Sequence, residues 1–435
     1  MITRLEVDGF KSLEGFAVDL EPFTVLIGPN SAGKSNILEA LALLSRLTKQ
    51  PIAEAFKNGR GRPSDQFTRK GSETAQKMSF AVELLAFDTD TRGQPPDHDR
   101  ESRFRYELAI ERQTLPSGAE RLVVTREGMQ NIPRTKDPWI EARPQFLRYA
   151  FYNDEHPTQF YSFKEHRTSS LNTGLYQLNT ASSLLYFLTR VLSADLAGCR
   201  ILQVGTARLG EPSDRLESGD LNADAANLPT VLAGLPKPLL GEIRADLVAL
   251  VPGMASFDVV PEGDEIHIDF ELSGGDRMPA RLVSDGTLRI LVLLTALRLE
   301  PRPPIVCIEE PENGIYPGRL RALLDLFLAE SQRSHDDTDA LARLDEHIKQ
   351  LGAVGIQANL LPTQILLTTH SPVLLAALRQ SPQHIRFVDT VRRDGHRRTR
   401  VRTVGRPTKA DHGRSTVSPR EIESLLDAAR SEEPA

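Results

Sequence analysis

The chain is poor in cysteine. Its 435 residues include only Cys199 and Cys307, which lie far apart and lack the spacing of metal ligands. So few cysteines exclude a disulfide framework and fit a reducing compartment such as the cytosol. Cys307 lies in the apolar run Ile305–Ile308, so we expect its thiol to be a small core side chain.

Long hydrophobic runs are absent as well. No segment approaches the roughly 18 consecutive apolar residues that span a membrane, and Ile2–Val7 alternates like a strand rather than resembling a signal peptide. The composition, with 40% hydrophobic and 26% charged residues, is ordinary for a globular protein. We therefore expect a soluble, cytoplasmic protein with no membrane partner.

An excess of positive charge is also lacking. The net charge of −6 restricts any DNA contact to local basic patches, of which the sequence offers two. For the loop around Arg60 and Arg62, phosphate contact and a solvated loop both stay open. The arginine-rich segment 392–402 is interpreted as the charged edge of a hairpin, with a phosphate track as the alternative. Neither patch interleaves with aromatic residues, so base stacking is not predicted.

A glycine-rich loop lies between an apolar strand, Phe23–Ile27, and a helix predicted over Asn36–Leu47. It matches G-x-x-x-x-G-K-[ST], the loop that wraps the phosphates of ATP or GTP. In this pattern the helix N-terminus binds the phosphates, Lys34 neutralises them and Ser35 ligates Mg²⁺. The predicted nucleotide-binding residues are Gly28, Pro29, Asn30, Ser31, Ala32, Gly33, Lys34, Ser35 and Asn36.

Two acidic residues end a second apolar strand, Ile305–Ile308. Neighbouring residues of a strand point to opposite faces, so Glu309 and Glu310 are expected to differ in role. We predict that Glu309 holds the Mg²⁺ shell through water and that Glu310 orients or activates the attacking water. The alternative is a pair of solvated loop acids.

Two further segments have the character of a phosphate site. His370 ends an apolar strand that begins at Ile365, and its ring is placed to donate to a γ-phosphate oxygen; a purely structural histidine is the alternative. Ser284 and Gly286 stand before an apolar helix predicted over Ile290–Leu299. They offer either a second anion-binding helix N-terminus or a simple N-cap.

Taken in order, these segments resemble the ATPase heads of the SMC/ABC type, in particular the RecF-like and OLD-like members. The resemblance rests on Gly9–Ser12, Gly28–Asn36, Val283–Thr287, Glu309–Pro317 and Thr369–Pro372. It implies a homodimer that closes around two molecules of ATP with Mg²⁺. The phosphate loop and Glu310 of one subunit would face Ser284 and Gly286 of the other, and Asn313 would lie at the dimer seam.

The chain departs from that family pattern at three points. The signature reads Val-Ser-Asp-Gly-Thr where transporters have Leu-Ser-Gly-Gly-Gln, so transporter coupling is not implied. Glu309 replaces the usual aspartate, which leaves the hydrolysis rate open. The glutamine that senses Mg²⁺ in the family is not identified among Gln76, Gln130, Gln145 and Gln159.

The expected fold is α/β, a P-loop NTPase of the ABC/SMC head type that is split in sequence. Its lobes are predicted at 1–140 and 253–435, around a mostly helical insertion at 141–252. Predicted helices are Ser182–Leu196, Asn222–Leu235, Pro238–Leu250 and Asp336–Leu351. The chain is expected to end in a hairpin, Ile385–Val391 with Arg397–Val404, and a helix capped by Ser418.

Three functions are compatible with these features. The first is a sensor ATPase in anti-phage or plasmid defence, which would control a separately encoded nuclease or toxin because no second catalytic cluster follows His370. The second is a RecF-like repair ATPase that clamps duplex DNA. The third is a scaffold that binds ATP and scarcely hydrolyses it.

Overall fold

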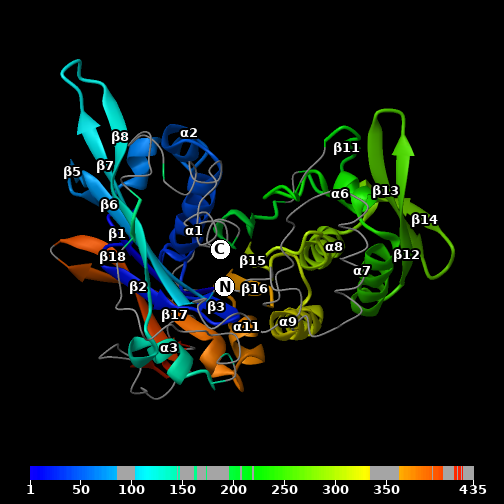
Figure 1. Cartoon of the computed structure of the whole chain (residues 1–435). Coiled ribbons are helices and arrows are strands. Elements are labelled where there is room, and N and C mark those ends of the chain that lie inside the picture. The colour runs from blue at the N-terminus through cyan, green and yellow to red at the C-terminus, as the bar shows by residue number, and fades with distance from the viewer. Residues whose placement is uncertain are drawn as a thin grey trace, which may run out of the picture.

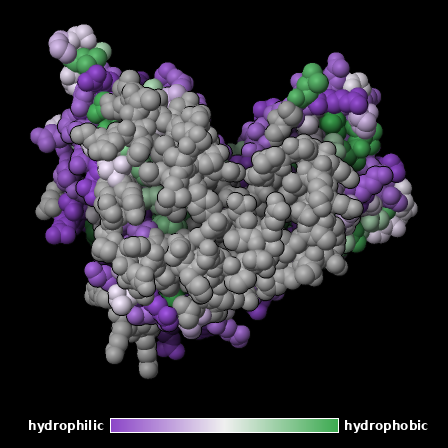
Figure 2. Space-filling model, viewed as in Figure 1, coloured by the Kyte–Doolittle hydropathy of each residue, from purple (hydrophilic) through white to green (hydrophobic). Residues whose placement is uncertain are grey.

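The computed structural model describes residues 1–85, 103–144, 146, 161–163, 173, 195–205, 208–217, 220–333, 362–393, 395–404, 416–418, 420–422 and 424. Figure 1 and Figure 2 show two lobes. The first and last parts of the chain form one lobe, with the two large sheets and α1, and the middle of the chain forms the other, with α6, α7, α8 and a small sheet.

A seven-stranded sheet forms the base of the first lobe. Its order is β10 (Cys199–Leu202), β15 (Ile305–Glu309), β16 (Gln364–Thr369), β3 (Phe23–Ile27), β17 (Ile385–Arg393), β18 (His396–Val404) and β19 (Thr416–Val417). Neighbours from β10 to β17 are parallel, and β17 and β18 form an antiparallel hairpin. Since parallel strands end at the same edge, the loops after β3, β15 and β16 meet there.

A six-stranded antiparallel sheet lies beside it. Its order is β2 (Phe16–Asp19), β1 (Ile2–Asp8), β6 (Lys77–Leu85), β7 (Arg103–Thr114), β8 (Glu120–Asn131) and β9 (Tyr161–Ser162). Two short strands, β4 (Arg69–Lys70) and β5 (Glu73–Thr74), pair with each other. The short helices α2 (Ile52–Lys57) and α3 (Pro138–Glu141) lie between the strands of this sheet in chain order.

The second lobe combines a small antiparallel sheet with helices. The sheet contains β11 (Ser213–Asp214), β13 (Glu265–Leu272), β12 (Met254–Glu262) and β14 (Arg277–Pro279). The helices of this lobe are α6 (Leu228–Gly234), α7 (Lys237–Leu250), α8 (Asp285–Leu297) and α9 (Pro317–Gln332). The short helix α11 (Pro372–Ala377) instead follows β16 of the seven-stranded sheet.

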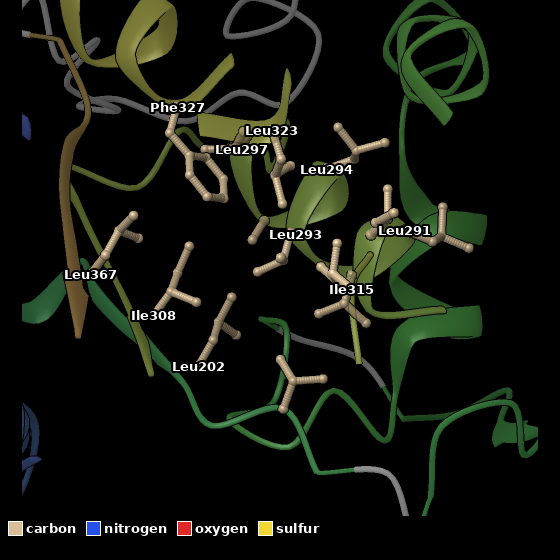
Figure 3. Close-up of a cluster of buried hydrophobic side chains, with 14 of the residues drawn as sticks. Leu202, Leu291, Leu293, Leu294, Leu297, Ile308, Ile315, Leu323, Phe327 and Leu367 are labelled. Atoms are coloured by element: carbon tan, nitrogen blue, oxygen red, sulfur yellow. The ribbon is translucent and has the colours of Figure 1, made fainter. Parts of the chain in front are cut away.

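Two hydrophobic cores cover the two faces of the seven-stranded sheet. Because side chains alternate along a strand, Val25 of β3 packs into one core and Leu26 into the other. The first core joins the sheet to α8 and α9, and Leu291, Ile308 and Phe327 belong to this one buried cluster (Figure 3). The second core holds α1 (Lys34–Lys49), whose buried residues recur at helical spacing. Helices α1 and α8 therefore lie on opposite faces of the sheet.

Most predicted elements are present within a few residues of their expected bounds. The Pro238–Leu250 helix is α7, the Asn222–Leu235 segment contains the shorter α6, and the predicted terminal hairpin is β17 with β18. The backbone N–H of Glu421 donates to the Ser418 hydroxyl, as expected of an N-cap. Helix Asp336–Leu351 and nearly all of Ser182–Leu196 lie outside the described residues.

The segment predicted as an insertion, 141–252, contributes more than helices. Strand β10 lies within it and pairs in parallel with β15, so it belongs to the central sheet. The sequence analysis did not predict this strand, because its four residues follow a stretch with a helical pattern.

The cysteines behave as core residues. Cys307 is fully buried in β15, and its Sγ lies 4.0 Å from the Sγ of Cys199 on β10. The hydrogen bond with Cys199 and complete burial raise the pKa of Cys307. No helix among the described residues is long and apolar enough to cross a membrane.

Candidate functional site

The phosphate loop leads from β3 into the N-terminus of α1. Gly33 has a φ of 97°, and a Cβ built on it would lie 2.0 Å from the Thr399 hydroxyl, so only glycine fits. Ser31 also has a positive φ, of 59°. Helix α1 begins at Lys34 directly after this turn. The loop thus places backbone N–H groups and a positive helix end at one point, as anion binding requires.

Lys34 is the buried cation of the site. Its Nζ donates to the carbonyl oxygens of Gly28 at 2.8 Å and Pro29 at 2.9 Å. Burial lowers the pKa of Lys34, and the nearby carboxylates of Glu310, Glu312 and Glu309 act in the opposite direction. A cation held among loop carbonyls and acids, with little solvent around it, has strong electrostatic interactions with a phosphate.

Glu309 faces Ser35 across the edge of the sheet. Burial raises the pKa of Glu309, while hydrogen bonds from Ser35 and Gln203 oppose the shift. Its Oε1 is buried and has no hydrogen-bond partner within the described part of the chain. A serine hydroxyl and an orphaned carboxylate oxygen are the ligands that Mg²⁺ accepts, so these residues fit the predicted metal role.

Gln203 was missed by the sequence analysis. It directly follows β10, and therefore reaches the same sheet edge as Glu309, its hydrogen-bond partner. Of the four glutamines considered from the sequence, Gln145 and Gln159 lie outside the described residues. Gln130 lies on β8 of the other sheet, and Gln76 lies just before β6, which belongs to that sheet too.

Glu310 and His370 lie together, as their positions after neighbouring strands predict. His370 Nδ1 is 3.1 Å from Glu310 Oε1, and the Asn313 amide donates to Glu310 Oε2 at 2.8 Å. Glu310 has a φ of 47°, and its backbone N–H donates to the carbonyl of Thr368 on β16. Both side chains are about one-third exposed, at 34% for Glu310 and 35% for His370, so they remain open to a reactant.

A third acid, Glu312, belongs to the same turn and was not singled out from the sequence. Its carboxylate accepts a hydrogen bond from the hydroxyl of Thr369, the last residue of β16. Burial raises the pKa of Glu312. Its Oε2 is buried without a partner in the described chain. Glu312 therefore joins the acidic turn to the strand that carries His370.

The signature segment does not share the phosphate-loop face of the sheet. Ser284 is exposed and caps α8, its hydroxyl accepting from the Thr287 N–H at 3.4 Å. Gly286 is buried, and a Cβ on it would lie 2.1 Å from the carbonyl oxygen of Gly314. Gly286 thus packs against the acidic turn of its own chain, while α8 lies across the sheet from α1 (Figure 1).

Acidic side chains pair with half of the arginines in the segment 392–402, namely three of six. Arg398 pairs with Glu14, Arg400 with Asp389, and Arg402 with both Asp389 and Glu421. The exposed arginines for which no ion pair is described are at the tip: Arg392, Arg393 and Arg397. These pairs support the interpretation as a charged edge over that of a continuous phosphate track.

Asn36 is the last of the predicted nucleotide-binding residues, and its side chain bonds to the turn after β1. Its amide donates to the hydroxyl of Ser12 at 2.7 Å. The site thus combines a phosphate loop, a buried lysine and two carboxylates with separate partners, one beside a serine and one beside a histidine. Such an arrangement can bind a nucleoside triphosphate and hold a water for attack on its last phosphate.

Comparisons with known proteins agree with this geometry. A family model described as "AAA domain, putative AbiEii toxin, Type IV TA system" matches residues 23–376. The chain is similar to "Structural maintenance of chromosomes protein 1" of Schizosaccharomyces pombe, with 34% identity over 92 residues, or 19% of this chain and 8% of that protein. It is also similar to the "OLD nuclease" of Thermus scotoductus, with 46% identity over 44 residues, or 10% of this chain and 8% of that protein.

A third relative is the "DNA replication and repair protein RecF" of Vibrio campbellii, with 28% identity over 111 residues, 19% of this chain and 31% of that protein. The matches thus span less than a third of each of these relatives. Among solved structures, an SMC head bound to the C-winged helix domain of ScpA has a TM-score of 0.47 and 17% identity. It covers 92% of this chain and 97% of that one.

Proposed function

The chain belongs to this AAA-domain family and is an ATPase of the SMC/ABC type, and we propose that it hydrolyses ATP as a switch controlling a separate effector. The observation that carries the proposal is the meeting of Lys34, Glu309 and Glu310 at one sheet edge. Phosphoryl transfer needs little beyond charge neutralisation, positioning and an oriented nucleophile, and these residues supply all three.

The roles follow from the partners of each side chain. Lys34 would neutralise the phosphates, and Ser35 and Glu309 would hold Mg²⁺, which would offset more of the negative charge of the phosphates. Among the described residues no cluster of three or more His, Cys, Asp or Glu could hold a metal ion by itself. Gln203, which hydrogen-bonds to the Glu309 carboxylate, would help to orient it.

Glu310 is the residue for the attacking water. The Asn313 amide holds one carboxylate oxygen and His370 holds the other, which fixes the orientation of the carboxylate. A fixed carboxylate can accept the proton of a water as it attacks. If Nδ1–H of His370 donates to Glu310, Nε2 of the neutral ring carries no proton. The ring can then donate to a phosphate from Nε2 only when it is protonated to the imidazolium.

The proposed switch is an ATP-closed homodimer. Ser284 and the neighbouring Leu282 are exposed, Leu282 to 66%, and Tyr316 beyond the acidic turn is 72% exposed. These residues would meet the partner's phosphate loop, which would assign Ser284 and Gly286 to the second nucleotide site. A ligand that binds only the closed state stabilises it by about 4 kcal/mol at a thousandfold excess over its Kd.

The effector is proposed to be a separate nuclease or toxin in cell defence. Support comes from the family description, which names a toxin of a toxin–antitoxin system, and from the similarity to an OLD nuclease. The test is to purify tagged E310Q from its native cell with ATP and to identify what remains bound after nuclease digestion. A stoichiometric second protein supports the proposal. Recovery of DNA alone, lost on digestion, contradicts it.

A DNA clamp is the second candidate, favoured by the exposed arginines of the hairpin tip and by Arg62. It requires that duplex DNA stimulate ATP hydrolysis and that the stimulation fall steeply with salt. Charge reversal at Arg62, Arg392 and Arg393 should then abolish stimulation while leaving basal hydrolysis unchanged. Hydrolysis that is insensitive to DNA contradicts this candidate.

A further inference from the structure

The C-terminal hairpin contacts the phosphate loop from outside the region matched by the family model. Strand β17 pairs with β3 up to Phe387 and then continues to Arg393, so the hairpin extends past the end of β3. A Cβ on Gly28 would lie 1.9 Å from the carbonyl oxygen of Val388, which shows how closely the hairpin approaches. On β18, Thr399 lies opposite Thr390 and is 4% exposed.

Thr399 makes three polar contacts there. Its hydroxyl donates to the carbonyl oxygen of Ala32 at 3.0 Å and lies 2.6 Å from the Ser12 hydroxyl. Its backbone N–H donates to the carbonyl of Ser12 at 2.9 Å. Next to it, Arg398 pairs with Glu14 at 2.8 Å, so consecutive residues of β18 bind the turn after β1.

The direction of each hydrogen bond follows from the donors available. The carbonyl of Ala32 can only accept, so the single hydroxyl proton of Thr399 is committed to it. The amide nitrogen of Asn36 can only donate, so Ser12 accepts from it at 2.7 Å. The hydroxyl proton of Ser12 therefore goes to Thr399, which gives an ordered chain from Asn36 through Ser12 and Thr399 to Ala32.

The end of this chain fixes a peptide plane in the phosphate loop. A trans peptide points its C=O and the next N–H in opposite directions, so holding the Ala32 carbonyl also orients the N–H of Gly33. Gly33 has a φ of 97° and, as a glycine, little steric preference of its own for this conformation. Loss of the Thr399 bond would therefore remove a constraint on the orientation of the Ala32–Gly33 peptide.

We propose that Thr399, acting with Ser12, is a positioning residue for nucleotide binding, because its hydroxyl fixes the Ala32–Gly33 peptide with the N–H directed at the phosphates. The inference rests on the proposed nucleotide-binding function. It adds two residues, one before and one after the family match at 23–376. Neither residue touches the reacting atoms.

The test compares T399V, which removes the hydroxyl at equal size, with T399S, which keeps it. Titration of each full-length protein with a fluorescent ATP analogue and MgCl₂ gives the Kd. Loss of the bond is expected to weaken binding by about fivefold to tenfold in T399V. T399S should stay near the wild-type value. The KM for ATP should rise in T399V with kcat nearly unchanged, because Glu310 and His370 are untouched.

Wild-type affinity in folded T399V overturns the inference, as does a T399S defect as large as that of T399V. If T399V does not fold, T399A decides, because it too removes the hydroxyl that holds the Ala32 carbonyl: weaker ATP binding supports the inference, and unchanged binding refutes it. In the double variant S12A/T399V the loss should not exceed that of T399V alone. If the wild-type protein itself shows no saturable binding that K34A abolishes, the proposed function fails instead.

Discussion

His370 Nδ1 lies 3.1 Å from Glu310 Oε1, although 60 residues separate the two in the chain. The contact arises because β15 and β16 are parallel neighbours and each ends just before one of these residues. Glu310 is also bonded to Asn313, so its carboxylate is held at both oxygens. Such a carboxylate has one orientation relative to a nucleotide on the adjacent loop.

The first prediction concerns that pair. E310Q removes the base but keeps the size of the side chain and an oxygen that can accept from the Asn313 amide. ATP turnover should therefore fall by about 10² to 10⁴ while nucleotide binding is retained. Steady-state phosphate release and equilibrium binding are the two measurements. H370A should slow turnover less, and E310Q/H370A should be no slower than E310Q, since both act on one water. An E310Q protein with unchanged turnover would support the ATP-binding scaffold.

The second prediction concerns Gln203. Because its amide bonds to the Glu309 carboxylate, Q203A should raise the Mg²⁺ concentration for half-maximal ATPase activity by about tenfold. The matched control is Q76A: Gln76 is exposed and its described hydrogen bond is made by its backbone carbonyl. Equal Mg²⁺ dependence in the two variants contradicts a metal-related role for Gln203.

Short-range patterns in the sequence predicted that the central residues of the candidate site lie together. The phosphate loop, the acids after β15 and the histidine after β16 each follow an apolar strand, and parallel strands bring such ends together. Helix bounds were less accurate: α8 begins at Asp285, five residues before the predicted Ile290, because Ser284 caps it. The apolar residues alone did not reveal that first turn.

Contacts that depend on tertiary approach were not predictable. Gln203 was missed because β10 has only four residues, and nothing local identifies it as a partner of β15. The contact of Thr399 with Ser12 joins the two ends of the chain, and no pattern in either segment implies it. The hydrogen bond between Glu312 and Thr369 likewise depends on the position of β16, which the sequence did not reveal.

The third prediction compares two glycines. G286A should destabilise the protein by about 1–3 kcal/mol, because its Cβ would lie 2.1 Å from the backbone oxygen of Gly314. G241A is the control: Gly241 is exposed within α7 and a Cβ there meets nothing within 4 Å. Alanine at 241 should stabilise the helix by up to about 1 kcal/mol. Thermal unfolding of both variants is the measurement, and equal Tm values would contradict the close packing of α8 on the acidic turn.

The last prediction is a pH dependence at Glu312. Burial raises the pKa of this carboxyl above its ordinary value of 4.5 in the unfolded chain, so ionisation is easier after unfolding. The stability contributed by the protonated carboxyl is complete below about pH 4.5 and is lost as the pH rises through the higher pKa of the folded protein.

E312Q keeps an oxygen for Thr369 and is neutral at every pH. Its Tm should therefore match the wild-type Tm near pH 4 and exceed it at pH 7 to 8. E211Q is the control, because Glu211 is exposed, and its Tm should follow the wild-type curve throughout. A Tm difference for E312Q that is constant across this range would mean that the Glu312 carboxyl has the same pKa in the folded and unfolded protein, and that burial at the acidic turn does not penalise its charge.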